Sequence, residues 1–149
     1  METVATRGYN GPPITSNKTI LEQVTKALVY LHNKNIIHGN VNPRAVVLCS
    51  TEDPNKPPVI KLADYEVSGG RDGWKSPEYL TDPEVLNEAC DVFSLGILFA
   101  FLLSNGQHPY GSPHMQNSNI LFGFYHLNPN LDAATLHLIT MMLEQEPIR

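Results

Sequence analysis

The chain has 149 residues, a formal net charge of −5 and two cysteines. This length suits one domain. The acidic balance, with scattered Lys and Arg, argues against a nucleic-acid partner, and two cysteines without a CxxC pair exclude a disulfide framework or zinc site. We therefore expect buried, reduced thiols in a cytoplasmic protein.

The first 63 residues predict a leader, a helix and a hairpin. Residues 1–13 read as a loose N-terminal leader, and residues 14–149 as the domain. Thr15, Ser16 and Asn17 are candidate N-caps for an amphipathic helix that ends near Asn33. The β-branched runs 45–48 and 59–63 predict two short strands joined by a long turn.

The second half predicts further helices. Residues 88–103 are apolar nearly all round, which indicates a helix buried on every side, with Asn105-Gly106 as its C-terminal stop. We expect a short helix at 120–125, and a last one at 133–143, capped by Asp132, with four inward side chains: Leu136, Ile139, Met142 and Leu143. The longest apolar run, 92–103, is too short to span a bilayer.

One loop and four landmarks point to a known fold. The stretch His38-Gly39-Asn40-Val41-Asn42-Pro43-Arg44-Ala45 has the outline of a protein-kinase catalytic loop, His-Arg-Asp-Leu-x-x-x-Asn. Tyr30-Leu31-His32 precedes it, and Asp64-Tyr65-Glu66, Ser76-Pro77-Glu78 and the run from Asp91 to Gly96 follow in kinase order. The chain therefore resembles a protein kinase.

Other segments resemble one branch, the inositol-requiring kinase/endoribonuclease family that senses unfolded protein in the endoplasmic reticulum. They are Leu21-Glu22-Gln23-Val24-Thr25, Gly73-Trp74-Lys75-Ser76-Pro77-Glu78, Asp91-Val92-Phe93-Ser94, Gly106-Gln107-His108-Pro109-Tyr110-Gly111 and Asn119-Ile120-Leu121-Phe122-Gly123. The resemblance covers about residues 14–149 and implies the kinase C-terminal lobe alone: a mainly α fold with a small β-hairpin. A Gly-rich loop, a strand lysine and a helix-C glutamate are not found in the chain, so we expect no N-terminal lobe.

The resemblance implies that no catalytic position is intact. Asn40 occupies the position of the base, and an amide cannot take up the hydroxyl proton as a carboxylate does. Asn42 replaces the phosphate-binding lysine, and Ala45 replaces the metal-binding asparagine. Asp64 corresponds to the other metal-binding and cofactor-binding position, although a cap or turn after a strand explains it more simply. Val47, with Val46 and Leu48, matches the surface under adenine or is core.

Five residues match architectural positions. His38 and Tyr65 match a buried column of the fold, and we expect His38 to be hydrogen-bonded rather than to carry protons. Asp91 should accept hydrogen bonds from the backbone of residues 38–40, because a buried carboxylate needs donors. Glu78 and Arg149 match an ion pair that ties the activation segment to the last helices.

We therefore predict a catalytically inactive, pseudokinase-like domain that acts, if at all, in interaction or regulation. No cofactor is expected, and Mg·ATP would bind only with an N-terminal lobe absent from this chain. An apolar surface around Val46, Val47 and Tyr65 should be exposed and favour a protein partner, such as a kinase-like relative or a regulatory target.

Two alternatives remain open. One is a partial chain of a serine/threonine kinase/endoribonuclease of the unfolded protein response, in which a missing lobe supplies ATP binding. The other is a decaying gene copy. The family resembled is anchored in the endoplasmic-reticulum membrane with its kinase domain facing the cytosol, and the chain itself contains no predicted membrane segment.

Overall fold

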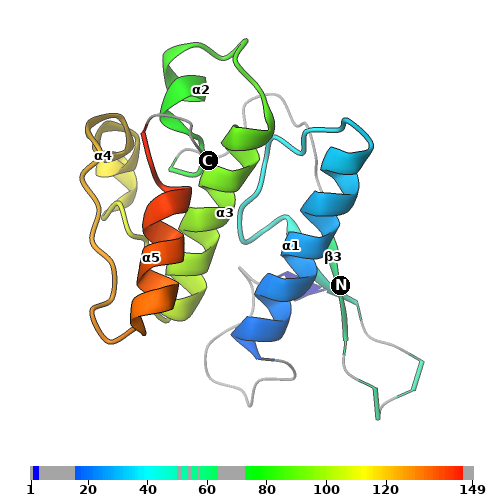
Figure 1. The fold of residues 1–149 in the computed structure, drawn as a ribbon. Coiled ribbons are helices and arrows are strands. Elements are labelled where there is room, and N and C mark those ends of the chain that lie inside the picture. Colours follow the sequence, from blue (N-terminus) through cyan, green and yellow to red (C-terminus); the bar gives the residue numbers. More distant parts are fainter. Residues whose placement is uncertain are drawn as a thin grey trace.

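The computed structural model describes residues 16–49, 52–53, 55–56, 58–63 and 73–145, together with the backbone of residues 2–3 (Figure 1). Helices dominate these residues, and a small antiparallel sheet lies beside the first helix. The predicted fold class, mainly α with a β-hairpin, is confirmed.

Helix α1 (Asn17–Asn33) begins and ends where its sequence signals place it. The Ser16 hydroxyl accepts a hydrogen bond from Thr19 N at 3.2 Å, which satisfies one of the free N–H groups of the first turn. The apolar face is buried through Ile20, Leu21, Val24 and Leu28. The Asn17 side chain also donates to Leu102 O at 2.9 Å, so the start of α1 is tied to the end of α3.

The sheet has three strands in the order β1 (Glu2–Thr3), β2 (Val46–Cys49) and β3 (Val59–Leu62). The β2–β3 hairpin was predicted, and its register pairs Val47 with Lys61. Strand β1 was not predicted, because residues 1–13 lack strand periodicity. Its pairing of Thr3 with Val47 places β2 between two neighbours, so this part of the expected leader is a strand.

The predicted exposure of Val46 and Val47 is wrong. Their side chains are 0% and 8% exposed. Val46 packs in the cluster between the sheet, α1 and α3, and β2 is the central strand of the sheet rather than an open edge. Tyr65, the third residue of the expected surface, lies outside the described residues. The interpretation of Val46 to Leu48 as core agrees with their burial.

Helix α3 (Glu88–Leu103) runs through the middle of the molecule between α1 and α5 (Figure 1). The Asn87 side chain caps its first turn by accepting from Cys90 N. Most of its side chains are buried, as the all-round apolar pattern predicts. Its end is also as predicted, since Asn105 and Gly106 both adopt positive φ.

The remaining elements differ in part from the expectations. Helix α2 (Pro77–Thr81) was not predicted, because five residues give no periodic pattern. A 3₁₀ turn, η1 (Pro113–Met115), leads into α4 (Gln116–Phe122), which lies earlier than the expected 120–125 because Gly123 ends it at φ +71°. Helix α5 (Ala133–Met142) is capped by Asp132 as predicted. Ile139, Met142 and Leu143 are buried, and Leu136 is half-buried.

Two clusters form the core on either side of α3. One joins α1, the sheet and α3, and the other joins α3, α4 and α5 around Phe93, Ile97 and Tyr110. Of the helices in the described part of the chain, none has both the length and the apolarity to cross a bilayer.

Gly96 lies where α3 packs against the end of α5. A Cβ atom at this position would lie 2.8 Å from the Met142 Cβ and 3.1 Å from a Leu143 methyl. Alanine raises helix propensity by about 1 kcal/mol, but overpacking costs about 1–3 kcal/mol. We expect Gly96→Ala to destabilise the domain by about 1 kcal/mol in urea unfolding, and Gly96→Val to destabilise it more. A stabilised Ala variant would show that α5 moves aside freely.

Candidate functional site

The carboxylate of Asp91 holds the loop that begins at His38. Asp91 is 1% exposed and lies in the first turn of α3. Its Oδ2 accepts from His38 N and its Oδ1 from Gly39 N, each at 2.8 Å. The imidazole of His32, on α1, donates from Nε2 to Oδ2 at 2.8 Å. The loop is therefore fixed to two helices, with the backbone contacts that the sequence analysis expected of Asp91.

Both ring nitrogens of His38 are used inside the fold. Nε2 donates to Ala63 O at 2.8 Å, and Nδ1 accepts from Asn40 N at 3.2 Å. These two bonds require a proton on Nε2 and a lone pair on Nδ1. With the side chain only 1% exposed, the geometry suits a structural residue that links the loop to the end of β3.

Lys75 holds the same loop through the carbonyl of Gly39. Its side chain is 7% exposed, and its ammonium donates to Gly39 O and lies 4.9 Å from the centre of the Tyr79 ring. Burial lowers the pKa of Lys75, whereas the nearby Asp91 carboxylate raises it. Asp91 therefore takes the N–H of Gly39 and Lys75 takes its carbonyl, so the loop backbone is clamped between opposite charges.

The two asparagines of the loop bond to each other and to the backbone. Asn42 is 1% exposed. Its Nδ2 donates to Asn40 O at 2.8 Å and to Asn40 Oδ1 at 3.0 Å, and its Oδ1 accepts from Arg44 N at 2.9 Å. Both polar atoms of the Asn42 side chain thus form hydrogen bonds that stabilise the turn. The side-chain oxygen at the predicted base position is an acceptor already occupied by a neighbouring amide.

Ala45 offers a buried methyl group where the resemblance places a metal ligand. The residue is 1% exposed. Its backbone accepts from Ala63 N at 2.7 Å and donates to Asn42 O at 3.0 Å, which joins the loop to the hairpin. A methyl group has no ligand atom, and Mg²⁺ requires oxygen donors. The side chain of Ala45 therefore cannot coordinate Mg²⁺.

Three of the predicted site residues lie outside the described residues: Asp64, Tyr65 and Arg149. The predicted ion pair between Glu78 and Arg149 therefore stays a prediction. Glu78 is half-buried in α2, with the Cys90 thiol 3.7 Å from its Oε1. Burial raises the pKa of Cys90. Val47 is buried in β2. In the ranges that the structure describes, no three His, Cys, Asp or Glu side chains gather as metal ligands would.

A second cluster positions the segment that contains Lys75. His108 Nε2 donates to Gly73 O at 2.7 Å, and its Nδ1 accepts from Tyr110 N at 3.1 Å. The His108 ring packs edge-on against Trp74 at 4.9 Å between centroids. Burial lowers the pKa of His108 to about 4. Trp74 and His108 line a cavity of about 540 Å³.

Sequence reasoning did not single out Lys75 or His108 as site residues. Both lie in motifs that carried the resemblance, but their partners are 36 and 35 residues away in the chain. The available signal was a lysine placed between Trp74 and the capping Ser76 in an otherwise uncharged stretch, 73–77. A charge in such a segment needs a buried partner.

The helical core, the hairpin and the anchored loop define a protein-kinase-like C-terminal lobe. The sequence model of the protein kinase domain matches residues 10–148. The chain therefore belongs to the protein kinase family.

Within that family, the similar proteins include several kinase/endoribonucleases. The chain is 32% identical over 153 residues to serine/threonine-protein kinase/endoribonuclease ire-1 of Caenorhabditis elegans, covering 88% of this chain and 16% of that protein. It is 28% identical to IRE1b of Arabidopsis thaliana (93% and 17%) and 29% identical to human IRE2 (71% and 13%). The chain thus spans less than a fifth of the length of these relatives.

Proposed function

We propose that this domain is a catalytically inactive kinase-like module that works through protein–protein contacts. The observation that carries the proposal is the state of the loop at 38–45. Its scaffold contacts, Asp91 to the backbone of residues 38 and 39, are those that hold a kinase loop in place. Its reactive positions carry Asn40, Asn42 and Ala45, which cannot perform the corresponding chemistry.

Phosphoryl transfer depends on positioning, metal ions and a proton acceptor. Loss of a general base typically lowers a rate by about 10²–10⁴-fold. Here the amide at Asn40 replaces the carboxylate, and its oxygen accepts from the Asn42 side chain. The methyl group of Ala45 removes a metal ligand, and Asn42 removes a positive charge. The three losses together support the absence of phosphotransfer and of a bound Mg·ATP cofactor.

An interaction role is supported by large apolar side chains that face solvent. Phe122 and Phe124 are 71% and 66% exposed, and their rings stack at 5.9 Å. The turn between them is held by Gly123 and by a bond from Phe124 N to Asn119 O at 2.8 Å. Rigid exposed aromatic residues are typical anchors of protein interfaces.

A second candidate comes from the relatives. These relatives are named serine/threonine-protein kinase/endoribonucleases, so the second candidate is the kinase-lobe part of such a protein, with ATP binding supplied elsewhere. The chain's own loop would still carry Asn40 and Ala45. We also propose a cytoplasmic location, because Cys49 and Cys90 form no disulfide.

Nucleotide binding is tested by thermal unfolding with and without Mg·ATP. A ligand that binds the native state raises stability by RT ln(1 + [L]/Kd). We expect no shift in the unfolding temperature of this chain in Mg·ATP relative to Mg²⁺ alone. A reproducible upward shift, together with protection by a non-hydrolysable analogue, would contradict the proposed absence of a bound Mg·ATP cofactor.

Phosphotransfer itself is tested with radiolabelled ATP and a generic protein substrate. We expect no incorporation by the natural chain. The matched comparison is a triple variant, Asn40→Asp, Asn42→Lys and Ala45→Asn, which restores the replaced positions. The proposal would fail if the natural chain incorporated phosphate and the triple variant incorporated the same amount. Another group would then perform the chemistry.

A further inference from the structure

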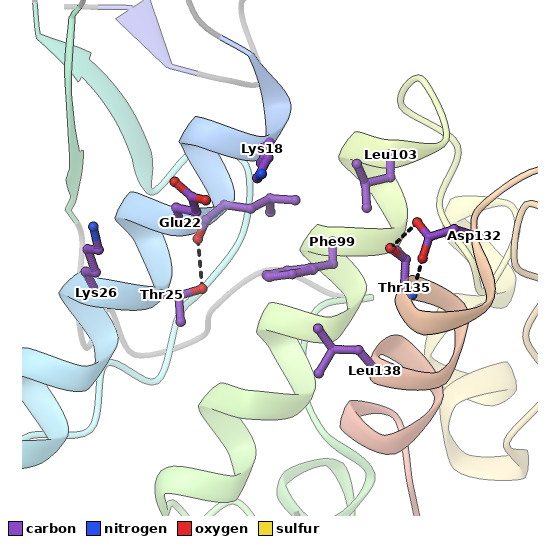
Figure 2. A pocket seen from close by; sticks show the side chains of 10 residues that line it. Lys18, Glu22, Thr25, Lys26, Phe99, Leu103, Asp132, Thr135 and Leu138 are labelled. Carbon is purple, nitrogen blue, oxygen red and sulfur yellow. Dashed lines mark hydrogen bonds between the residues drawn. The ribbon is translucent and has the colours of Figure 1, made fainter.

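A groove between three helices lies outside the loop at 38–45. It is bounded by α1 and α5, has α3 as its floor, and has a volume of about 760 Å³ (Figure 2). Its apolar lining comes from all three helices: Leu21, Phe99, Leu103 and Leu138. Leu138 is 45% exposed, so apolar surface faces solvent along the groove.

The polar groups inside the groove are already bonded. Thr25 Oγ1 donates to Leu21 O at 2.7 Å. Thr135 Oγ1 donates to the Asp132 carboxylate at 2.6 Å, and Thr135 N donates to the same group at 2.9 Å (Figure 2). These bonds lower the pKa of Asp132, which therefore stays ionised as the cap of α5. The groove interior thus presents methyl and aromatic carbon to an occupant.

The rim on α1 carries charges of alternating sign. Lys18, Glu22 and Lys26 follow at four-residue spacing, line the groove and are all exposed. At about 1.5 Å per residue they span about 12 Å along the helix. Among the described residues, the salt bridge of the structure joins His32 to Asp91 and involves none of these three side chains. The three rim charges are therefore available to a partner.

We propose that this groove binds an amphipathic helix of a partner protein, whose polar flank carries an acid, a base and an acid at positions i, i+4 and i+8. Such a helix places its apolar stripe on Phe99, Leu103 and Leu138 and pairs each of its charges with one on α1. The pattern is symmetric, so it fits in either chain direction. This inference rests on the proposed interaction function and names the partner's chemistry.

The charge pattern also selects among occupants. A lipid-like molecule with one anionic head would pair with one lysine and meet Glu22 beside it. The α1 helix of a second copy carries the same Lys-Glu-Lys pattern, and in the same register it would oppose like charges, which is unfavourable. A partner helix of the complementary pattern satisfies all three charges.

The test uses fluorescence polarisation with two labelled helical peptides about 18 residues long. Both have the same leucine stripe, and their flanks read Glu-x₃-Lys-x₃-Glu or the reverse, Lys-x₃-Glu-x₃-Lys. Since exposed pairs contribute little singly, we expect the first peptide to bind about tenfold more tightly than the second. The triple variant Lys18→Glu, Glu22→Lys, Lys26→Glu should reverse this preference.

Two further variants separate the groove from general effects. Leu138→Asp should weaken both peptides by at least about tenfold, and this residue is exposed enough for the variant to fold. Lys56→Glu, an exposed charge change in the β2–β3 loop, should leave both affinities within about twofold.

Equal affinity of the two peptides for the natural chain would overturn the proposal, as would a triple variant without reversed preference. A third result would also overturn the proposal: dodecanoate binds, Leu138→Asp abolishes that binding, and neither peptide binds. The groove would then be a small-molecule site. No residue of the loop at 38–45 lines the groove, so the Mg·ATP and phosphotransfer tests give their answer independently.

Discussion

Replacing Asp91 by Asn should destabilise the domain by about 3–5 kcal/mol, because a charge-assisted network loses its acceptor. Two backbone N–H groups and the His32 imidazole donate to this carboxylate at 2.8 Å each. An asparagine keeps one oxygen and turns an NH₂ group toward a donor. The Lys75 ammonium also loses its nearby counter-charge.

Urea unfolding of the Asp91→Asn variant measures this loss. For a chain of this size the unfolding temperature should fall by about 6–20 °C. Asp53→Asn, the same chemical change in an exposed turn, should stay within about 0.5 kcal/mol of the natural chain. A comparable loss in both variants would mean that net charge, rather than the network at the loop, is responsible.

The sequence predicted the long elements well because their boundaries are encoded locally. Ser16, Asn87 and Asp132 cap helices whose apolar patterns run for several turns. Gly106 stops α3 as expected. Helix α2 is too short for a pattern, and α4 was shifted because the glycine at 123 was not taken as its end.

At the loop, the kinase motif located His38 and Asp91 correctly in space, since their order in the chain fixes their place in the fold. The charge clamp was not predictable in the same way. Lys75 meets Gly39 through a contact across 36 residues, and no local pattern specifies it. The burial of Val47 likewise depends on its pairing with β1. Strand β1 has only two residues and lies in a segment without strand periodicity.

Acid should weaken the domain through His108. Burial lowers the pKa of this residue from 6.5 to about 4. In the folded chain Nδ1 accepts from Tyr110 N, so protonation would break that bond. A depressed histidine pKa means that the unfolded chain binds the proton more tightly. The resulting stability is fully present above pH 6.5 and is lost as the pH falls toward 4. A fall from 6.5 to about 4 corresponds to about 3 kcal/mol.

The measurement is the free energy of unfolding in urea at several pH values across this window. The natural chain should lose stability with a slope of up to about 1.4 kcal/mol per pH unit from His108. His108→Gln should be less stable at neutral pH but should lose that part of the slope. His137→Gln, the same change at an exposed position on α5, should keep it. If His108→Gln retains the full slope, the titrating group lies elsewhere, and the bond between His108 and Tyr110 N carries no acid sensitivity.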